Sequence, residues 1–216
     1  NAPFLSWHER GRPWVTLKAA MSWDGQIAAA GGSSTWVTGE LARRHAHRLR
    51  FTHDAVLVGA GTIRRDDPRL NVRLDGTEIA RQVVVLSESL DLPATAKIFA
   101  SGRPRIYTTR AAEGPLTAIA DVIRVSDLGE MLRDLAREGV QSVLVEGGGR
   151  THAAFLEAGL ADEVALFVAP RLFGAEGGTP LLAGPAAASP DGAWVLADVR
   201  TIAVGSDLLV TARPER

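Results

Sequence analysis

Residues 140–156, VQSVLVEGGGRTHAAFL, decide the prediction of the fold. The stretch begins with a short apolar run typical of a buried strand, continues with three glycines at 147–149, and ends in a helix predicted over 150–158 and closed by Gly159. A strand, a glycine turn and a helix start in this order aim free backbone N–H groups at an anion, usually a phosphate. Glu146 ends the strand, where ligand-facing residues of open α/β sheets lie. The run is neither the dinucleotide nor the P-loop fingerprint, so by itself it is equally compatible with a structural turn.

The composition is that of an ordinary globular protein, with 46% hydrophobic and 23% charged residues among 216. The net charge of −1 offers no basic field for nucleic acid, and no apolar run reaches the roughly 18 residues that a membrane span needs. Cysteine is absent, which excludes disulfides, thiolate zinc sites and a cysteine nucleophile, and is compatible with a cytoplasmic protein. The N-terminus carries no secretory signal and starts at Asn1, so we expect a processed, trimmed or partial sequence.

Apolar patterning predicts strands that alternate with helices and then a pair of long strands at the C-terminus. Strands are predicted over 14–20, 55–58, 82–86, 105–108, 122–125, 140–145 and 162–169, helices over 39–52, 127–138 and 150–158, and a hairpin over 193–204 and 207–212. This order predicts one three-layer α/β domain over residues 12–216, with a mostly parallel sheet and an antiparallel C-terminal hairpin. Residues 1–11 lack periodicity and are expected to be an arm or a linker remnant.

Several residues outside the opening stretch have both a structural and a functional interpretation. Lys18 lies in a predicted strand, so it is either on a solvated face or at a site beside the strand end. Trp36 follows a flexible Gly/Ser loop, and either anchors that loop or stacks on a flat ligand ring. The arginines of the helix predicted over 39–52 form either a solvated basic face or a phosphate clamp. His45 and His47 face different sides of that helix, so no metal site is predicted between them.

A second glycine-rich turn is predicted at 59–62, directly after the strand at 55–58. Arg64, Arg65 and Asp66 follow it. Two glycine turns at strand ends, each followed by charged residues, indicate a ligand that carries two anionic groups.

Four segments of the chain resemble the reductase domain of riboflavin biosynthesis, the C-terminal half of the bifunctional bacterial deaminase/reductase. They are RPWVTLKAAMSWDGQIA, STWVTG, VGAGTIRRDDPRLNVR and VEGGGRTHAAFLEAGLADEVALFVAPRLFG, within residues 12–213. The joint occurrence of K-x-x-x-S-x-D-G, D-D-P-x-L and E-G-G in this order is specific. The resemblance implies a dihydrofolate-reductase-like fold. It also implies an oxidoreductase that uses NADPH to convert 5-amino-6-(5-phosphoribosylamino)uracil to its ribitylamino product.

The resemblance also implies roles for individual residues. NADPH would be bound by Ala20, Trp36, Thr62, Asp66, Ser87, Gly148, Gly149, Arg150 and Thr151, and substrate by Ser34, Arg50, Leu70, Arg73 and Glu146. Lys18 would lie beside the reacting sugar. Our hypothesis for catalysis is that Lys18, Asp66 and Glu146 surround the sugar carbon C1′ and that one of them relays a proton. Arg50 and Arg73 would grip the 5′-phosphate, and Arg64, Arg65 and Ser87 are the candidates for a cofactor 2′-phosphate.

Two features depart from the family pattern. Trp23 replaces the leucine usual before Asp24-Gly25, and the H-x-E…P-C-x-x-C deaminase motif is absent, so this chain alone is not expected to deaminate. The resemblance suggests a homodimer, with a fused or separate deaminase domain as partner and no metal.

Two alternatives to the riboflavin-type reductase stay open: a related reductase acting on a pterin, a folate or another imine or carbonyl, and a non-catalytic nucleotide-binding module. The choice between NADPH and NADH is left open by the sequence.

Overall fold

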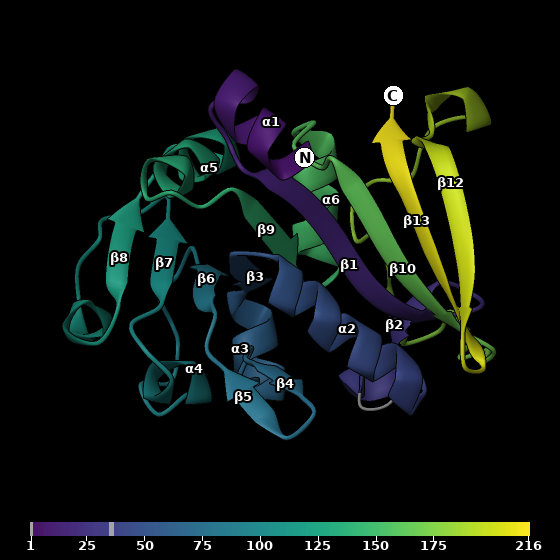
Figure 1. Cartoon of the computed structure of the whole chain (residues 1–216), viewed down its shortest axis with the longest axis horizontal. Helices are drawn as coiled ribbons and strands as arrows, with labels where there is room; N and C mark the ends of the chain where they lie inside the picture. The colour runs from purple at the N-terminus through teal and green to yellow at the C-terminus, as the bar shows by residue number, and fades with distance from the viewer. Residues whose placement is uncertain (1, 35–36) are drawn as a thin grey trace. The chain divides into compact units, whose positions relative to one another are not determined.

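The computed structural model describes residues 2–34 and 37–216 (Figure 1). They divide into two compact units. The first unit comprises Asn1–Trp14 and His47–Glu146, and the second comprises Val15–Ala46 and Gly147–Arg216. Within the described ranges, no helix combines the length and the apolar character that crossing a bilayer requires.

The first unit is built on five parallel strands in the order β9-β3-β6-β7-β8. They are β3 (Ala55–Gly59), β6 (Gln82–Leu86), β7 (Arg105–Thr108), β8 (Asp121–Arg124) and β9 (Ser142–Val145). The first four residues of β3 and all of β9 are buried, which explains why their sequences AVLVG and SVLV are apolar without alternation. The remaining elements are α1 (Ala2–Arg10), α3 (Ala60–Asp66), α4 (Lys97–Ala100), α5 (Leu128–Arg137), the 3₁₀ turn η2 (Pro115–Ala118) and the short hairpin β4 (Val72–Leu74) and β5 (Thr77–Ile79).

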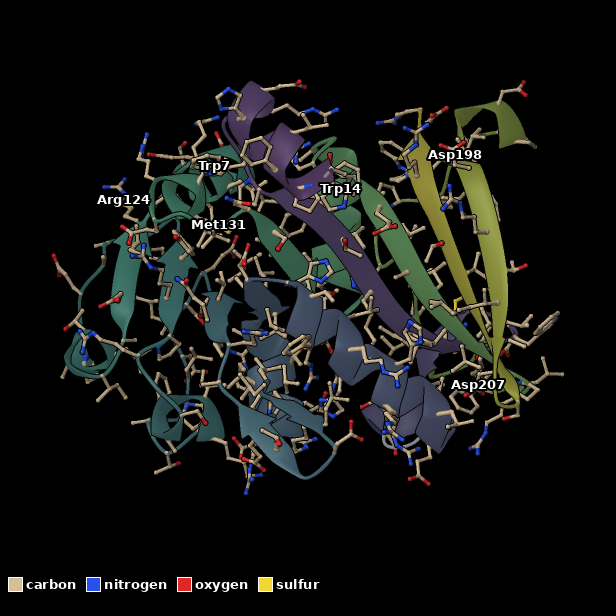
Figure 2. All side chains as sticks on the ribbon, in the orientation of Figure 1. Trp7, Trp14, Arg124, Met131, Asp198 and Asp207 are labelled. Atoms are coloured by element: carbon tan, nitrogen blue, oxygen red, sulfur yellow. The ribbon has the colours of Figure 1, made fainter. Side chains whose placement is uncertain are left out.

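Helix α5 forms where the sequence predicts a helix, over residues 127–138. The Asp127 carboxylate accepts the N–H of Glu130 over 2.7 Å, and the Glu130 carboxylate accepts the N–H of Ser126 over 2.7 Å, which is a capping box. Met131, labelled in Figure 2, lies with two leucines on a stripe that is fully buried. Gly139 has a φ of 83° and follows the helix end.

Helix α1 forms in the segment where the sequence predicts no regular element. Its Trp7, which lies beside α5 in Figure 2, donates its indole N–H to the carbonyl of Ala136 over 3.0 Å. The Ser6 hydroxyl donates to the carbonyl of Arg12 over 3.2 Å. Because the stretch has no strong apolar period, these tertiary contacts and not its sequence pattern stabilise the helix.

Four strands of the second unit follow the order β12-β13-β10-β1, in which β1 and β10 are parallel and the remaining pairs antiparallel. They are β1 (Trp14–Ser22, starting one residue inside the first unit), β10 (Glu163–Ala169), β12 (Val195–Val204) and β13 (Asp207–Glu215). The unit also holds α6 (Gly149–Glu157), the start of α2 (Glu40–Thr52), the 3₁₀ turns η1 (Ala30–Gly32) and η3 (Pro190–Gly192), and the short pair β2 (Gln26–Ala28) and β11 (Thr179–Pro180). A mostly parallel α/β arrangement with an antiparallel C-terminal hairpin is therefore confirmed.

The predicted glycine turn at 59–62 is wrong. Helix α3 begins at Ala60, immediately after β3, and Gly59 precedes it with an ordinary φ of −80°. The glycines at 59 and 61 are compatible with strand and helix backbone, so the G-A-G-T sequence turns by entering a helix at once. The short hairpin of β4 and β5 is also not predicted, although Asp75-Gly76 between its strands is a strong turn signal, and neither is the pairing of β2 with β11, which are far apart in sequence.

Candidate functional site

Glu146 and Arg50 form a bidentate ion pair inside the first unit. Glu146 follows β9 directly, and its N–H donates to the Leu57 carbonyl of β3 over 2.8 Å. Arg50 Nε and Nη2 lie 2.6 and 3.0 Å from the two carboxylate oxygens. The two side chains are 15% and 9% exposed, so little water is present to weaken the pair. Burial lowers the pKa of Arg50, but the charge and hydrogen bonds of Glu146 outweigh burial and raise that pKa above its ordinary value.

Asn71 connects this pair to a second arginine. Its carbonyl accepts Nη1 of Arg50 over 2.9 Å, and its side-chain Oδ1 accepts Nη1 of Arg73 over 2.9 Å. Its amide nitrogen donates to Glu78 over 3.0 Å, and the backbone N–H of Arg73 donates to Nδ1 of His47 over 3.1 Å. The arginines that the resemblance assigns to the substrate are therefore held in one hydrogen-bonded network.

Leu70 precedes this network in a backbone conformation that a bulky side chain rarely adopts. It is 3% exposed, and its φ is 54°, in the left-handed region. This backbone conformation lowers the stability of the folded chain by about 1–2 kcal/mol. It persists only where the surrounding structure fixes it, commonly beside functional sites.

The cofactor residues predicted in the first unit lie at the ends of α3 and β6. Thr62 is in the first turn of α3, and Asp66 is its last residue, exposed and 3.3 Å from Nε of Arg65. Ser87 is buried, and its hydroxyl accepts the N–H of Leu90 over 3.1 Å. Arg64, a candidate for the 2′-phosphate, donates to the Asp91 carbonyl over 2.9 Å. The Ser87 hydroxyl therefore has a structural partner of its own in the turn after β6.

Lys18 lies in β1 of the second unit, with a half-buried side chain beside an aromatic cluster. Its Nζ is 5.8 Å from the ring centroid of Phe167, whose strand neighbour in register is Ala20. The ring of His45 meets Phe167 edge-on at 5.8 Å. An ammonium over a buried ring face is stabilised by a cation–π interaction, so the structure does not support a freely solvated Lys18.

The first turn of α6 starts at a glycine without a side-chain cap. Gly148 precedes the helix with φ −78° and ψ 176°, and no side chain caps it. A Cβ on Gly147 would lie 2.5 Å from the Cβ of Thr151, and a Cβ on Gly149 would lie 2.5 Å from the Pro180 carbonyl. These glycines are thus needed for close packing and not for a left-handed turn. The uncapped N–H groups fit a cofactor phosphate, and Arg150 is exposed beside them.

Two predicted ligand residues, Ser34 and Trp36, lie beside or outside the residues that the structure describes. Ser34 is half-buried and follows η1, within the second unit. Trp36 lies outside the described residues, so its predicted contact with the cofactor stays a prediction. Across residues 2–34 and 37–216, no group of three or more His, Asp or Glu side chains could hold a metal ion.

Sequence reasoning missed Asn71 and Asp24. Asn71 is not predicted, because an asparagine that bonds to two arginines carries no local pattern. Asp24 is noted only within the family motif, yet its carboxylate accepts two N–H groups from residues about 150 positions away. Only the tertiary structure reveals either role.

Comparison with known proteins places the chain in one family. The model described as RibD C-terminal domain matches residues 13–210. A riboflavin biosynthesis protein RibD from Bacillus amyloliquefaciens is 34% identical over 226 residues, covering 100% of this chain and 61% of that protein. RibD of Acinetobacter baumannii has a TM-score of 0.89 at 28% identity, covering 100% of this chain and 61% of that one.

The third relative carries a more specific name. It is a Thermotoga maritima diaminohydroxyphosphoribosylaminopyrimidine deaminase/5-amino-6-(5-phosphoribosylamino)uracil reductase, with a TM-score of 0.82 at 30% identity, covering 99% of this chain and 60% of that one. The chain spans about three fifths of the length of these relatives. The predicted dihydrofolate-reductase-like fold is confirmed by the fold comparison. The chain belongs to the RibD C-terminal domain family.

Proposed function

We propose that the chain reduces the ribose of 5-amino-6-(5-phosphoribosylamino)uracil with NADPH, giving the ribitylamino product of riboflavin biosynthesis. The observation that carries the proposal is the Arg50–Glu146 pair, placed at the carboxyl end of β9 directly before the glycine start of α6. Its support is the family match and the reductase name of the Thermotoga maritima relative. Residues 12–216 are the reductase domain in this proposal.

The chemistry requires an open-chain imine at the sugar carbon C1′. NADPH supplies the hydride that reduces it. Opening the ribose ring needs a proton for the ring oxygen, and the imine carries positive charge as it forms. Glu146, paired with Arg50, stabilises that charge, and one of Lys18 and Asp66 relays the proton.

The two arginines proposed for the substrate phosphate, both in the first unit, have different roles. Arg50 uses Nε, Nη1 and Nη2 in the hydrogen bonds described above, so its main role is to orient Glu146. Arg73 is exposed and is oriented by Asn71, which leaves it as the principal phosphate contact. Ser34 and Leu70 complete the proposed substrate set.

The proposed cofactor is NADPH and not NADH. The first turn of α6, with Gly148, Gly149, Arg150 and Thr151, takes its phosphates. Thr62, Asp66, Ser87, Ala20 and Trp36 complete the contacts, and Arg64 and Arg65 are the side chains that would distinguish the 2′-phosphate.

In this proposal the enzyme is a cytoplasmic homodimer that works with a deaminase domain. Support for self-association comes from the last strand in the order, β12, which exposes Val195, Val199 and Ile202 by 63%, 54% and 52%. Support for the deaminase partner comes from the length and double name of the Thermotoga maritima relative.

The test is oxidation of NADPH, followed by its absorbance, with the deaminated ribosylamino-pyrimidinedione phosphate as substrate. NADH and dihydrofolate are run beside it. We expect oxidation of NADPH with the phosphorylated pyrimidine alone. Activity on dihydrofolate instead would favour a related reductase of the same fold. Binding of NADPH without any turnover would favour a non-catalytic nucleotide module.

A further inference from the structure

A segment of the second unit, residues 171–184, is fastened at three points, and we call it the strap. It follows the end of β10 and is fixed first at Asp24, in the turn between β1 and β2. The Asp24 carboxylate accepts the N–H groups of Phe173 over 3.1 Å and Gly174 over 2.7 Å. The hydroxyl of Ser22 donates to the same carboxylate. Hydrogen bonds to an ionised acceptor are the strong ones, so this is a firm attachment for an exposed segment.

The middle of the strap lies along β2. Its short strand β11 pairs antiparallel with β2, and the N–H of Leu181 donates to the Gly25 carbonyl over 3.0 Å. At Gly178 a Cβ would lie 2.7 Å from Oε1 of Gln26 and 3.0 Å from the Gly174 carbonyl. The strap therefore fits against β2 with no room for a side chain at Gly178.

The far end of the strap lies against α6. The N–H of Ala183 donates to the Gly149 carbonyl over 3.1 Å. The Pro180 carbonyl occupies the space that a side chain on Gly149 would need, and a Cβ on Gly184 would lie 2.8 Å from Glu157 Oε1. The strap thus contacts the first residue of the helix whose start is uncapped.

We propose that Asp24 is a positioning residue for cofactor binding, which acts by fastening the strap that holds the first turn of α6. The inference rests on the proposed function, because it assigns that turn to the phosphates of NADPH. N–H groups bind a phosphate well only where their direction is fixed beforehand, and here no side-chain cap fixes the helix start. The strap supplies it through Ala183 and Pro180, and the strap is itself held by the Asp24 carboxylate.

The charge of Asp24 persists under working conditions. The Ser22 hydroxyl and the N–H of Phe173 lower the pKa of Asp24 below its usual 3.8, although desolvation opposes them. The carboxylate is therefore ionised at neutral pH and accepts these hydrogen bonds at full strength.

The experiment compares Asp24→Asn with the wild-type chain in three measurements. The Kd of NADPH is measured by titration, the KM and kcat of the reductase reaction by initial rates, and the rate of trypsin cleavage after Arg171, at the start of the strap, by mass spectrometry. We expect the variant to raise both Kd and KM for NADPH about tenfold, with kcat at saturation changed less than about threefold. Cleavage after Arg171 should be faster in the variant, and NADPH should slow it in the wild type.

Glu176→Gln is the matched control, since Glu176 is an exposed carboxylate on the outer turn of the same strap, and it should behave as wild type. Gly178→Ala is a second route, which displaces the strap while keeping Asp24, and should also raise the Kd of NADPH. It keeps the inference testable if Asp24→Asn does not fold.

Each contrary result has a separate meaning. Unchanged cleavage in Asp24→Asn would show that Asp24 does not hold the strap. Faster cleavage with an unchanged Kd would show that the strap does not serve the cofactor. An unchanged Kd in Gly178→Ala would also overturn the inference. A wild-type chain that binds no NADPH would instead overturn the proposed function, and the inference with it.

Discussion

At the scale of the residue, Arg50 and Glu146 depend on each other. Each loses its partner if the other is truncated, and an unpaired buried charge costs about 3 kcal/mol of the free energy of unfolding. Arg50→Met and Glu146→Leu should each destabilise by that amount, whereas the double variant should recover most of the loss because neither charge remains. Urea unfolding measures this, and all three variants should lack reductase activity. Simple additivity in the double variant would contradict the pairing.

Lys18 can be tested for a chemical role with little disturbance of packing. Lys18→Met keeps an unbranched stem near Phe167 and removes the ammonium. If Lys18 relays a proton, kcat should fall about 100-fold or more with saturating substrate. Lys97→Met is the control, because Lys97 is the only other lysine in the sequence and forms an exposed ion pair with Asp67. Full turnover by the Lys18 variant would leave Lys18 without a chemical role.

At the scale of the element, the capping box of α5 couples stability to pH. The N–H of Glu130, then the Ser126 hydroxyl, lowers the pKa of Asp127 below 3.8, and the N–H of Ser126 lowers that of Glu130 below 4.5. Because both values are lower in the folded chain, the stabilisation is complete above the unfolded values and is lost as the pH falls through the folded ones. Asp127→Ala, which removes the side-chain cap, should lower the Tm by a few degrees at neutral pH, and this difference should shrink in acid. Exposed Asp191→Ala should leave the Tm unchanged at both pH values.

The same helix shows what the sequence could predict. The caps and apolar stripe of α5 are local, so its bounds were predicted to within a residue. The start of α3 is not predicted, because a glycine after a strand favours a turn in the sequence, although the backbone there is ordinary. Glu146 and Arg50 were each singled out by the motif resemblance, but their pairing spans 96 residues, and no local pattern records a contact of that range.

At the scale of the whole molecule, the order of segments in the sequence does not show which of them form each unit. The first unit is largely one continuous stretch, whereas the second joins Val15–Ala46 with Gly147–Arg216. Its parallel strands β1 and β10 pair Lys18 with Ala165 in register. Alternating β and α patterns predicted the class of fold, but strand order depends on packing across such distances. The C-terminal hairpin was predicted because its two strands are adjacent in sequence.

That hairpin also allows a test of assembly. Strand β12 lies at the edge of the sheet, and its register with β13 shifts between Ala197 and Arg200. Asp198, labelled in Figure 2, lies within this shift and forms an ion pair with Arg213. A bulge disrupts the pairing of an edge strand locally, so association should use the regular part of β12 around Ile202.

Ile202→Glu places a charge on an apolar position that is 52% exposed. We expect light scattering to give twice 22.9 kDa for the wild type and 22.9 kDa for the variant. Leu172→Glu, on a more exposed leucine outside the hairpin, is the control and should leave the mass unchanged. A wild type that is monomeric at every concentration would refute the dimer, and a dimeric Ile202→Glu would place its interface elsewhere.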